Sequence, residues 1–104
     1  MSERFLDMLL SLERWSRERG LSVTDLAILG AAADGITMSA LAENLAVSTA
    51  AVTGLADKLQ RLGLLFRKVS VADRRKVFVL LTDAGRELLA IVGKMIDKEY
   101  AGKS

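Results

Sequence analysis

The chain has 104 residues, a formal net charge of +2, 51% hydrophobic residues, and neither cysteine nor histidine. This composition predicts one domain with a single hydrophobic core, and it excludes a disordered chain, disulfide bonds and thiol chemistry. Without histidine and cysteine, only carboxylates remain as strong metal ligands. No apolar run reaches the ~20 residues that cross a bilayer, and no signal-peptide pattern is present. We therefore expect a cytoplasmic protein without a metal, a cofactor or a membrane partner.

The first predicted element is a helix over residues 3–19, which Gly20 ends. Its apolar residues recur at helical spacing and extend beyond one stripe: Phe5, Leu6, Met8, Leu9, Leu10, Leu12 and Trp15. A helix that is apolar over more than one face usually packs on a second surface. The next helix begins at Ser22, which forms a capping-box pattern with Asp25, and it runs as a core helix to the turn at Asp34-Gly35.

Residues 37–63 predict a helix-turn-helix. Thr37 is a suitable N-cap for a short helix, Ala46-Val47 form the turn, and Ser48 caps a longer helix. Apolar residues recur at helical spacing in both helices: Met38, Leu41, Ala42, Leu45, and then Val52, Leu55, Leu59, Leu62, before Gly63. Such a unit can lay its second helix in the major groove of DNA. The alternative is a helix pair that serves only as core architecture.

Residues 64–82 predict two strands joined by a basic loop. The runs at 64–69 and 77–82 are rich in β-branched, aliphatic and aromatic side chains, and SVADRRK separates them. Thr82 then caps a last helix over residues 83–100. Residues 48–76 carry seven basic and two acidic residues, whereas residues 1–47 carry four basic and seven acidic residues. This concentration of positive charge at the second helix and the loop points to nucleic acid as a partner.

The order of these elements resembles that of the MarR family of winged helix-turn-helix transcription regulators. The family pattern LAxxLxxSxxxVTxxxxxLxxxGLxxR is matched by SALAENLAVSTAAVTGLADKLQRLGLLFR, and the family's wing and next helix by DRRKVFVLLTDAGRELL. The resemblance covers about residues 21–90. It implies a mainly α fold with a small β-hairpin, a winged helix-turn-helix in which residues 1–104 form a single domain.

The sequence departs from the family pattern in three respects. Ala46 stands where such sequences commonly have glycine, and because an alanine at positive φ costs about 1 kcal/mol we expect this turn to differ. Gly54 lies inside the second helix, at a cost of up to about 1 kcal/mol relative to alanine. The usual last C-terminal helix is missing from the sequence. We expect a homodimer in which the helices at 3–19 and 83–100 pair across a two-fold axis, somewhat as in the ArsR family.

The helix-turn-helix supplies the first set of candidate DNA contacts. They are Ser39, Ser48, Thr49, Ala50, Thr53, Gly54 and Lys58. Hydroxyls and helix N–H groups can bond phosphates or base edges, but they cannot make the bidentate contacts of arginine or asparagine, so sequence readout through this helix should be thin. Two interpretations of Thr53 stay open, a DNA contact or a bond back to its own helix.

The wing supplies the second set. Asp73-x-Arg75 matches a family pattern that implies an aspartate orienting an arginine, which then enters the minor groove. An arginine at a hairpin tip suits a narrow groove of strong negative potential. Further phosphate contacts are expected from Arg67, Lys68, Arg74 and Lys76. The alternative is a solvated loop that touches nothing.

These observations predict a homodimeric, DNA-binding transcription regulator, a repressor on a pseudo-palindromic operator of double-stranded DNA. The first alternative is an architectural or plasmid-partition protein that coats DNA, and the second is a winged-helix module that binds an acidic protein. An enzyme is not expected, because no nucleophile–base pair can be assembled. Family habit also implies a small-molecule effector, aromatic or anionic, near Trp15 and Met8.

Overall fold

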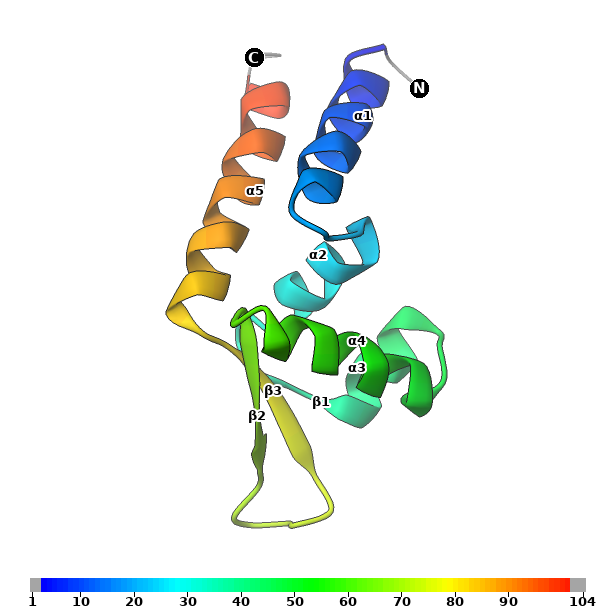
Figure 1. Ribbon diagram of the computed structural model, residues 1–104, viewed down its shortest axis with the longest axis vertical. Helices are drawn as coiled ribbons and strands as arrows, with labels where there is room; N and C mark the ends of the chain where they lie inside the picture. Colours follow the sequence, from blue (N-terminus) through cyan, green and yellow to red (C-terminus); the bar gives the residue numbers. More distant parts are fainter. Residues whose placement is uncertain (1–2, 102–104) are drawn as a thin grey trace.

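The computed structural model describes residues 3–101, which form five α-helices and a three-stranded antiparallel sheet (Figure 1). In chain order the elements are α1 (Glu3–Glu18), α2 (Val23–Ala31), β1 (Ile36–Thr37), α3 (Met38–Leu45), α4 (Thr49–Arg61), β2 (Leu65–Val69), β3 (Val77–Leu81) and α5 (Asp83–Ala101). The predicted fold class is confirmed. Among the described residues, no helix is long and apolar enough to span a membrane.

The molecule is elongated, with extents of 46 × 27 × 26 Å. α1 and α5 lie side by side at one end, and the β2–β3 hairpin projects from the opposite end (Figure 1). The three short helices α2, α3 and α4 lie between them. The hairpin and the helix-turn-helix are therefore exposed together, away from the terminal helices.

Local capping sets the starts of the middle helices. The Ser22 hydroxyl accepts the Asp25 N–H at 3.1 Å and Asp25 Oδ2 accepts the Ser22 N–H at 2.8 Å, which completes the expected capping box. Thr37 and Ser48 cap α3 and α4, each accepting a backbone N–H at 3.1 Å. Each cap satisfies an N–H group that the first helical turn leaves unpaired.

The expectation of a different turn at Ala46 is wrong. Ala46 adopts the left-handed conformation itself, with φ 55° and ψ 42°, and is the one residue other than glycine with positive φ in the described chain. The N–H groups of Ala46 and Val47 donate to the carbonyls of Glu43 and Ala42, both at 3.1 Å. These bonds close the C-terminus of α3 and offset a strain of about 1 kcal/mol.

The sheet contains one strand more than the predicted hairpin. β1 pairs with β3, Ile36 opposite Val79 and Thr37 opposite Phe78, so that the strand order is β1-β3-β2. Two residues are too few to show a strand periodicity, and Thr37 is at the same time the cap of α3. The additional strand fixes the start of the helix-turn-helix to the wing.

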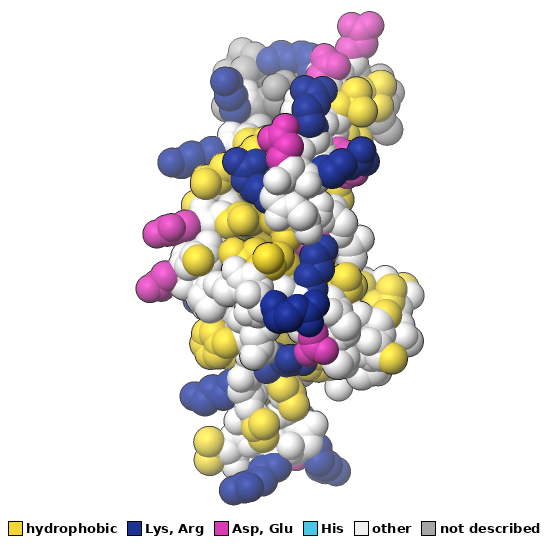
Figure 2. Space-filling view, viewed as in Figure 1, with side chains coloured by type: hydrophobic (Ala, Val, Ile, Leu, Met, Phe, Trp, Pro, Cys, Tyr) yellow, Lys and Arg dark blue, Asp and Glu magenta, His cyan; other side chains and the backbone are white. Residues whose placement is uncertain are grey.

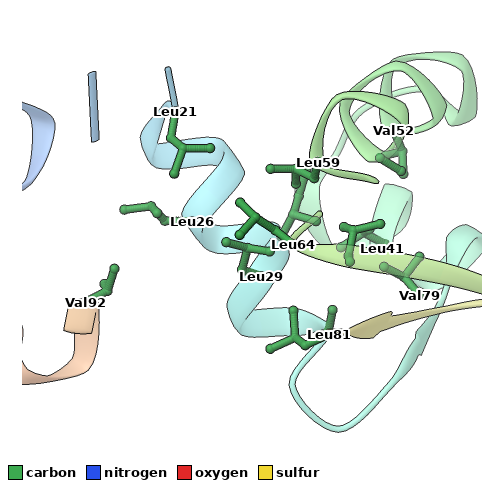
Figure 3. Close-up of a cluster of buried hydrophobic side chains, with 14 of the residues drawn as sticks. Leu21, Leu26, Leu29, Leu41, Val52, Leu59, Leu64, Val79, Leu81 and Val92 are labelled. Atoms are coloured by element: carbon green, nitrogen blue, oxygen red, sulfur yellow. The ribbon is translucent and has the colours of Figure 1, made fainter. Parts of the chain in front are cut away.

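The core lies where α2, α3 and α4 meet the sheet (Figure 3). Its fully buried apolar side chains of greatest volume are Ile28, Leu29, Leu41, Leu59, Leu65, Val52 and Val79. Full burial of one such side chain stabilises the fold by about 1.5–3 kcal/mol. Because Val52 and Leu59 lie on the buried side of α4, the opposite side of this helix faces outward.

Thr82 joins three elements through its backbone and hydroxyl groups. Its Oγ1 donates to the Gly63 carbonyl at 2.6 Å and accepts the Gly85 N–H at 3.1 Å, while its own N–H donates to the Leu64 carbonyl at 3.2 Å. Thr82 therefore caps α5, as expected, and also holds the start of α5 against the segment between α4 and β2.

Candidate nucleic-acid interface

The exposed side of the first two turns of α4 carries only small side chains. Ser48, Thr49, Ala50, Thr53 and Gly54 are all exposed, whereas Val52 and Ala56 lie in the core. A Cβ atom added at Gly54 would meet nothing within 4 Å, so the fold itself does not require glycine there. A partner can approach the backbone of this helix closely.

Thr53 donates its hydroxyl proton to the Thr49 carbonyl at 2.9 Å, one helical turn earlier. Of the two interpretations of Thr53, the structure contains the hydrogen bond back to its own helix. Since the proton is used within the helix, the Thr53 oxygen remains available mainly as an acceptor. The neighbouring Thr49 hydroxyl has an exposed position at the start of the helix.

Lys58 lies on the side of α4 that faces α2. Its Nζ is 2.6 Å from Oδ2 of Asp25, whose side chain is fully buried. The ammonium group thus has a partner inside the protein, 33 residues away in the sequence. This geometry argues against the predicted phosphate contact, and we leave Lys58 out of the proposed interface.

Arg67 connects the wing to α4. Its Nη2 lies 2.5 Å from Oδ1 of Asp57 and its Nε donates to Oε1 of Gln60 at 3.0 Å. Lys68, the next residue along β2, points to the other face of the sheet because side chains alternate along a strand. Arg67 is therefore directed toward the helix-turn-helix, and Lys68 away from it.

The wing tip is fixed by hydrogen bonds around Asp73. Arg75 Nε donates to Asp73 Oδ1 at 3.1 Å and Arg75 Nη2 donates to Oδ2 at 3.3 Å, and the Arg75 N–H also donates to Oδ1 at 3.1 Å. The Arg75 side chain is nevertheless 90% exposed. The aspartate thus sets the direction of the guanidinium while leaving it accessible, and Figure 2 shows basic side chains at this end of the molecule.

These bonds also act on the acidity of Asp73. The side-chain hydrogen bonds from Arg75, and then its backbone N–H, lower the pKa of the Asp73 carboxyl below 3.8, and the charge of Lys76 acts in the same direction. Because the folded-state pKa is lowered, the stabilisation by the Asp73–Arg75 pair is present above about pH 4 and is lost only as the pH falls further. The carboxylate that orients Arg75 is therefore ionised at neutral pH.

Five predicted residues from three elements surround one hollow between α3, α4 and the wing, together with Met38 and Val77. Its volume is about 320 Å³, and it is lined by Met38, Ser39, Thr49, Thr53, Arg67, Arg75 and Val77. Two arginines and three hydroxyls thus converge on a concave surface. Thr53 and Arg67 use donors within the protein, but the Ser39 and Thr49 hydroxyls and the exposed Arg75 guanidinium can donate to an anion such as a phosphate group.

Other predicted residues lie outside this hollow. Arg74 and Lys76 are exposed at the wing tip, and Arg74 lines a separate hollow with Val69, Ser70 and Val71. The sequence analysis did not predict that Asp57 and Gln60 bind the guanidinium of Arg67. Strand alternation from the buried Leu65 would have placed Arg67 on the side of the helices, where such partners lie.

A helix-turn-helix followed by a hairpin with a basic tip defines a winged helix-turn-helix protein. The sequence model of the MarR family matches residues 19–76, more than half of the chain, and this chain belongs to that family of DNA-binding transcriptional regulators. Within the part of the chain that the structure describes, no three His, Cys, Asp or Glu side chains gather as a metal site.

Individual relatives agree with this assignment. The transcriptional regulator HosA of Escherichia coli O157:H7 is 32% identical over 96 residues, which cover 86% of this chain and 71% of HosA. The crystal structure of YusO from Bacillus subtilis is 25% identical, with a TM-score of 0.79, over 95% of this chain and 72% of YusO. Streptococcus pneumoniae FabT in complex with DNA is 28% identical, with a TM-score of 0.80 and the same two coverages.

Proposed function

We propose that this MarR-family regulator is a homodimeric cytoplasmic repressor of a pseudo-palindromic operator. In this proposal α4 of each copy enters the major groove and each wing enters a neighbouring minor groove. The two half-sites lie about one helical turn, ~10 bp, apart. Repression results from occlusion of a promoter, and no catalysis is involved.

The observation that carries the proposal is the Arg75–Asp73 pair at an exposed wing tip, next to the N-terminus of α4. Arg75 and Thr49 line the same hollow, so one stretch of DNA can meet both. FabT, which shares this fold, is in complex with DNA. Ser39, Lys68, Arg74 and Lys76 are proposed to contact phosphates around these two elements.

The small side chains of α4 limit direct base readout. Ser48, Thr49 and Thr53 offer hydroxyl groups, and Ala50 offers a methyl group that can touch thymine. None of these makes the bidentate bonds by which arginine reads guanine. We therefore propose that sequence preference depends strongly on DNA shape and on the wing.

The proposal is tested by selecting binders from a random-sequence duplex library over a salt titration, with wild type beside Arg75→Ala. Wild type is expected to enrich a short palindromic motif, and Arg75→Ala to bind the motif about ten-fold more weakly because the minor-groove contact is lost. Arg61→Ala is the matched control, since Arg61 is an exposed arginine at the end of α4. Absence of binding at low and physiological salt would sink the proposal.

The homodimer is proposed from the apolar outer surface of α1 and α5. Leu6, Leu9, Leu10 and Ile91 are exposed, and Leu10 is exposed to 61%. Leu9 and Leu10 follow Leu6 by three and four residues on α1, and several exposed large apolar side chains on one helix are typical of an interface. Sedimentation of the wild type is expected to give a dimer at micromolar concentration, and Leu10→Glu a monomer that keeps its helical spectrum; a wild-type monomer would contradict the model.

A second candidate function is an architectural protein that coats DNA, and the absence of long side chains on the exposed side of the first two turns of α4 favours it. The same library distinguishes the two. Tight binding without an enriched motif, together with an extended footprint, would support the coating protein. The third candidate, a module that binds an acidic protein, would show negligible DNA affinity at physiological salt.

We also propose that an aromatic or anionic effector binds between the terminal helices. Met8, Ser11, Met95 and Lys98 line a hollow of about 210 Å³ there. Trp15 lies on α1, one turn or more from this hollow, with the Arg19 guanidinium 4.1 Å from its ring centre. Trp15 fluorescence should respond to aromatic carboxylates, and an unchanged spectrum across such a panel would argue against an effector here.

A further inference from the structure

The wing tip presents an apolar surface beside its arginines. Val71 is 92% exposed, the largest exposed fraction among the large hydrophobic side chains in the described chain, and Val69 at the end of β2 is 52% exposed. Together with Ser70 and Arg74 these valines line a shallow hollow of about 310 Å³. Single exposed apolar residues are common, but here two valines stand together in a basic loop.

Hydrogen bonds divide the tip into two consecutive turns. Ser70 Oγ accepts the Asp73 N–H at 3.2 Å, and the Asp73 carbonyl accepts the Lys76 N–H at 2.9 Å. The Ser70 N–H donates to the Lys76 carbonyl at 2.9 Å, which closes the loop. Val71 and Ala72 therefore occupy the crest of the first turn, and Arg74 and Arg75 that of the second. Both crests project from one tip of fixed shape.

We infer that Val71 is a specificity-determining residue that lies in the minor groove with Arg75 and favours A·T over G·C pairs. This inference rests on the proposed function. In the minor groove a G·C pair presents the guanine N2 amino group, a donor that valine cannot accept, whereas an A·T pair presents no donor. Desolvating that amino group without a partner is unfavourable, so the valine crest fits A·T pairs better.

The charges around Val71 identify DNA as the occupant of this surface. Arg74, Arg75 and Lys76 follow it within five residues, and Lys68 precedes it by three residues in β2. An apolar protein surface would have to desolvate these charges, whereas the phosphates that border the minor groove neutralise them. Between those phosphates, Val71 meets the apolar sugar walls and the base edges.

The test compares binding to three alternating polymers at one salt concentration, by competition against a labelled duplex. Poly(dA-dT) and poly(dI-dC) lack the minor-groove amino group, and poly(dG-dC) carries it. Wild type is expected to prefer the first two by about five-fold. Val71→Ser is expected to reduce this preference below about two-fold, mainly through tighter binding to poly(dG-dC), because a serine hydroxyl oxygen can accept the guanine amino group. Val23→Ser, the same change at an exposed position of α2, should leave the preference unchanged.

Each other outcome overturns a defined part of the argument. Equal binding of the wild type to all three polymers overturns the inference, as does a preference that persists in Val71→Ser. In the latter case groove width read by Arg75 would account for it, and Arg75→Ala would abolish it. Failure of the wild type to bind any polymer would instead remove the proposed function. Val71→Ser should have the same unfolding midpoint as the wild type, because the Val71 side chain is exposed and its replacement removes no core contact.

Discussion

Replacing Gly85 by alanine is expected to destabilise the fold by about 3 kcal/mol. Gly85 is buried in the first turn of α5, and a Cβ atom there would overlap the backbone carbonyl oxygen of Leu64. That oxygen cannot retreat freely, since it accepts the Thr82 N–H at 3.2 Å. The clash would therefore separate the start of α5 from the segment between α4 and β2.

The measurement is urea unfolding followed by circular dichroism, at one protein concentration for all variants. Gly30→Ala is the matched control, because Gly30 is exposed in α2 and an added Cβ meets nothing within 4 Å. This control is expected to gain up to about 1 kcal/mol from helix propensity. Equal midpoints for the two variants would show that α5 can shift without cost and would refute the packing argument.

Lys58→Met is expected to cost about 2–4 kcal/mol, an effect that comes mainly from the carboxylate it leaves behind. Asp25 is fully buried, and its Oδ1 has no hydrogen-bond partner among the described residues. Without Lys58, the charge of Asp25 would keep only the Ser22 N–H at 2.8 Å. The Lys58 side chain is 35% exposed, which places the loss below that of a fully buried pair.

Replacing the other partner of the pair, Asp25, should cost less free energy of unfolding. In Asp25→Asn the amide oxygen can still accept the Ser22 N–H, and the partly exposed Lys58 can turn to water, so we expect about 1 kcal/mol. The double variant should lose less than the sum of the single losses. Unfolding midpoints of the four proteins check this cycle, and additive losses would mean that the two side chains do not stabilise each other.

Local signals in the sequence were sufficient for most of the fold. The caps at Ser22, Thr37, Ser48 and Thr82 each depend on atoms within three residues, so a short pattern predicts them. The hairpin strands follow from β-branched runs on either side of a basic loop. The left-handed Ala46 was missed because its own propensity opposes the conformation that the bonds of its neighbours impose.

Contacts between distant segments were not predictable from spacing. Lys58 looks like a surface lysine in the sequence, and only the packing of α2 against α4 brings it to Asp25. Arg67 likewise meets Asp57 only once β2 folds back along α4. For the same reason, sequence patterns predicted five of the residues that line the hollow between α3, α4 and the wing, but not that these five lie together.

The bonds made by Thr82 also limit how the molecule can move. The Thr82 hydroxyl bonds both the Gly63 carbonyl just after α4 and the Gly85 N–H at the start of α5, and Thr82 itself directly follows β3, so hydrogen bonds tie these three elements together at one residue. We expect a tilt of α5 to move the end of α4 and the base of the wing in the same direction. In the proposed dimer, we expect adjustment to curved DNA to come from the wing tip and from the angle between the two copies.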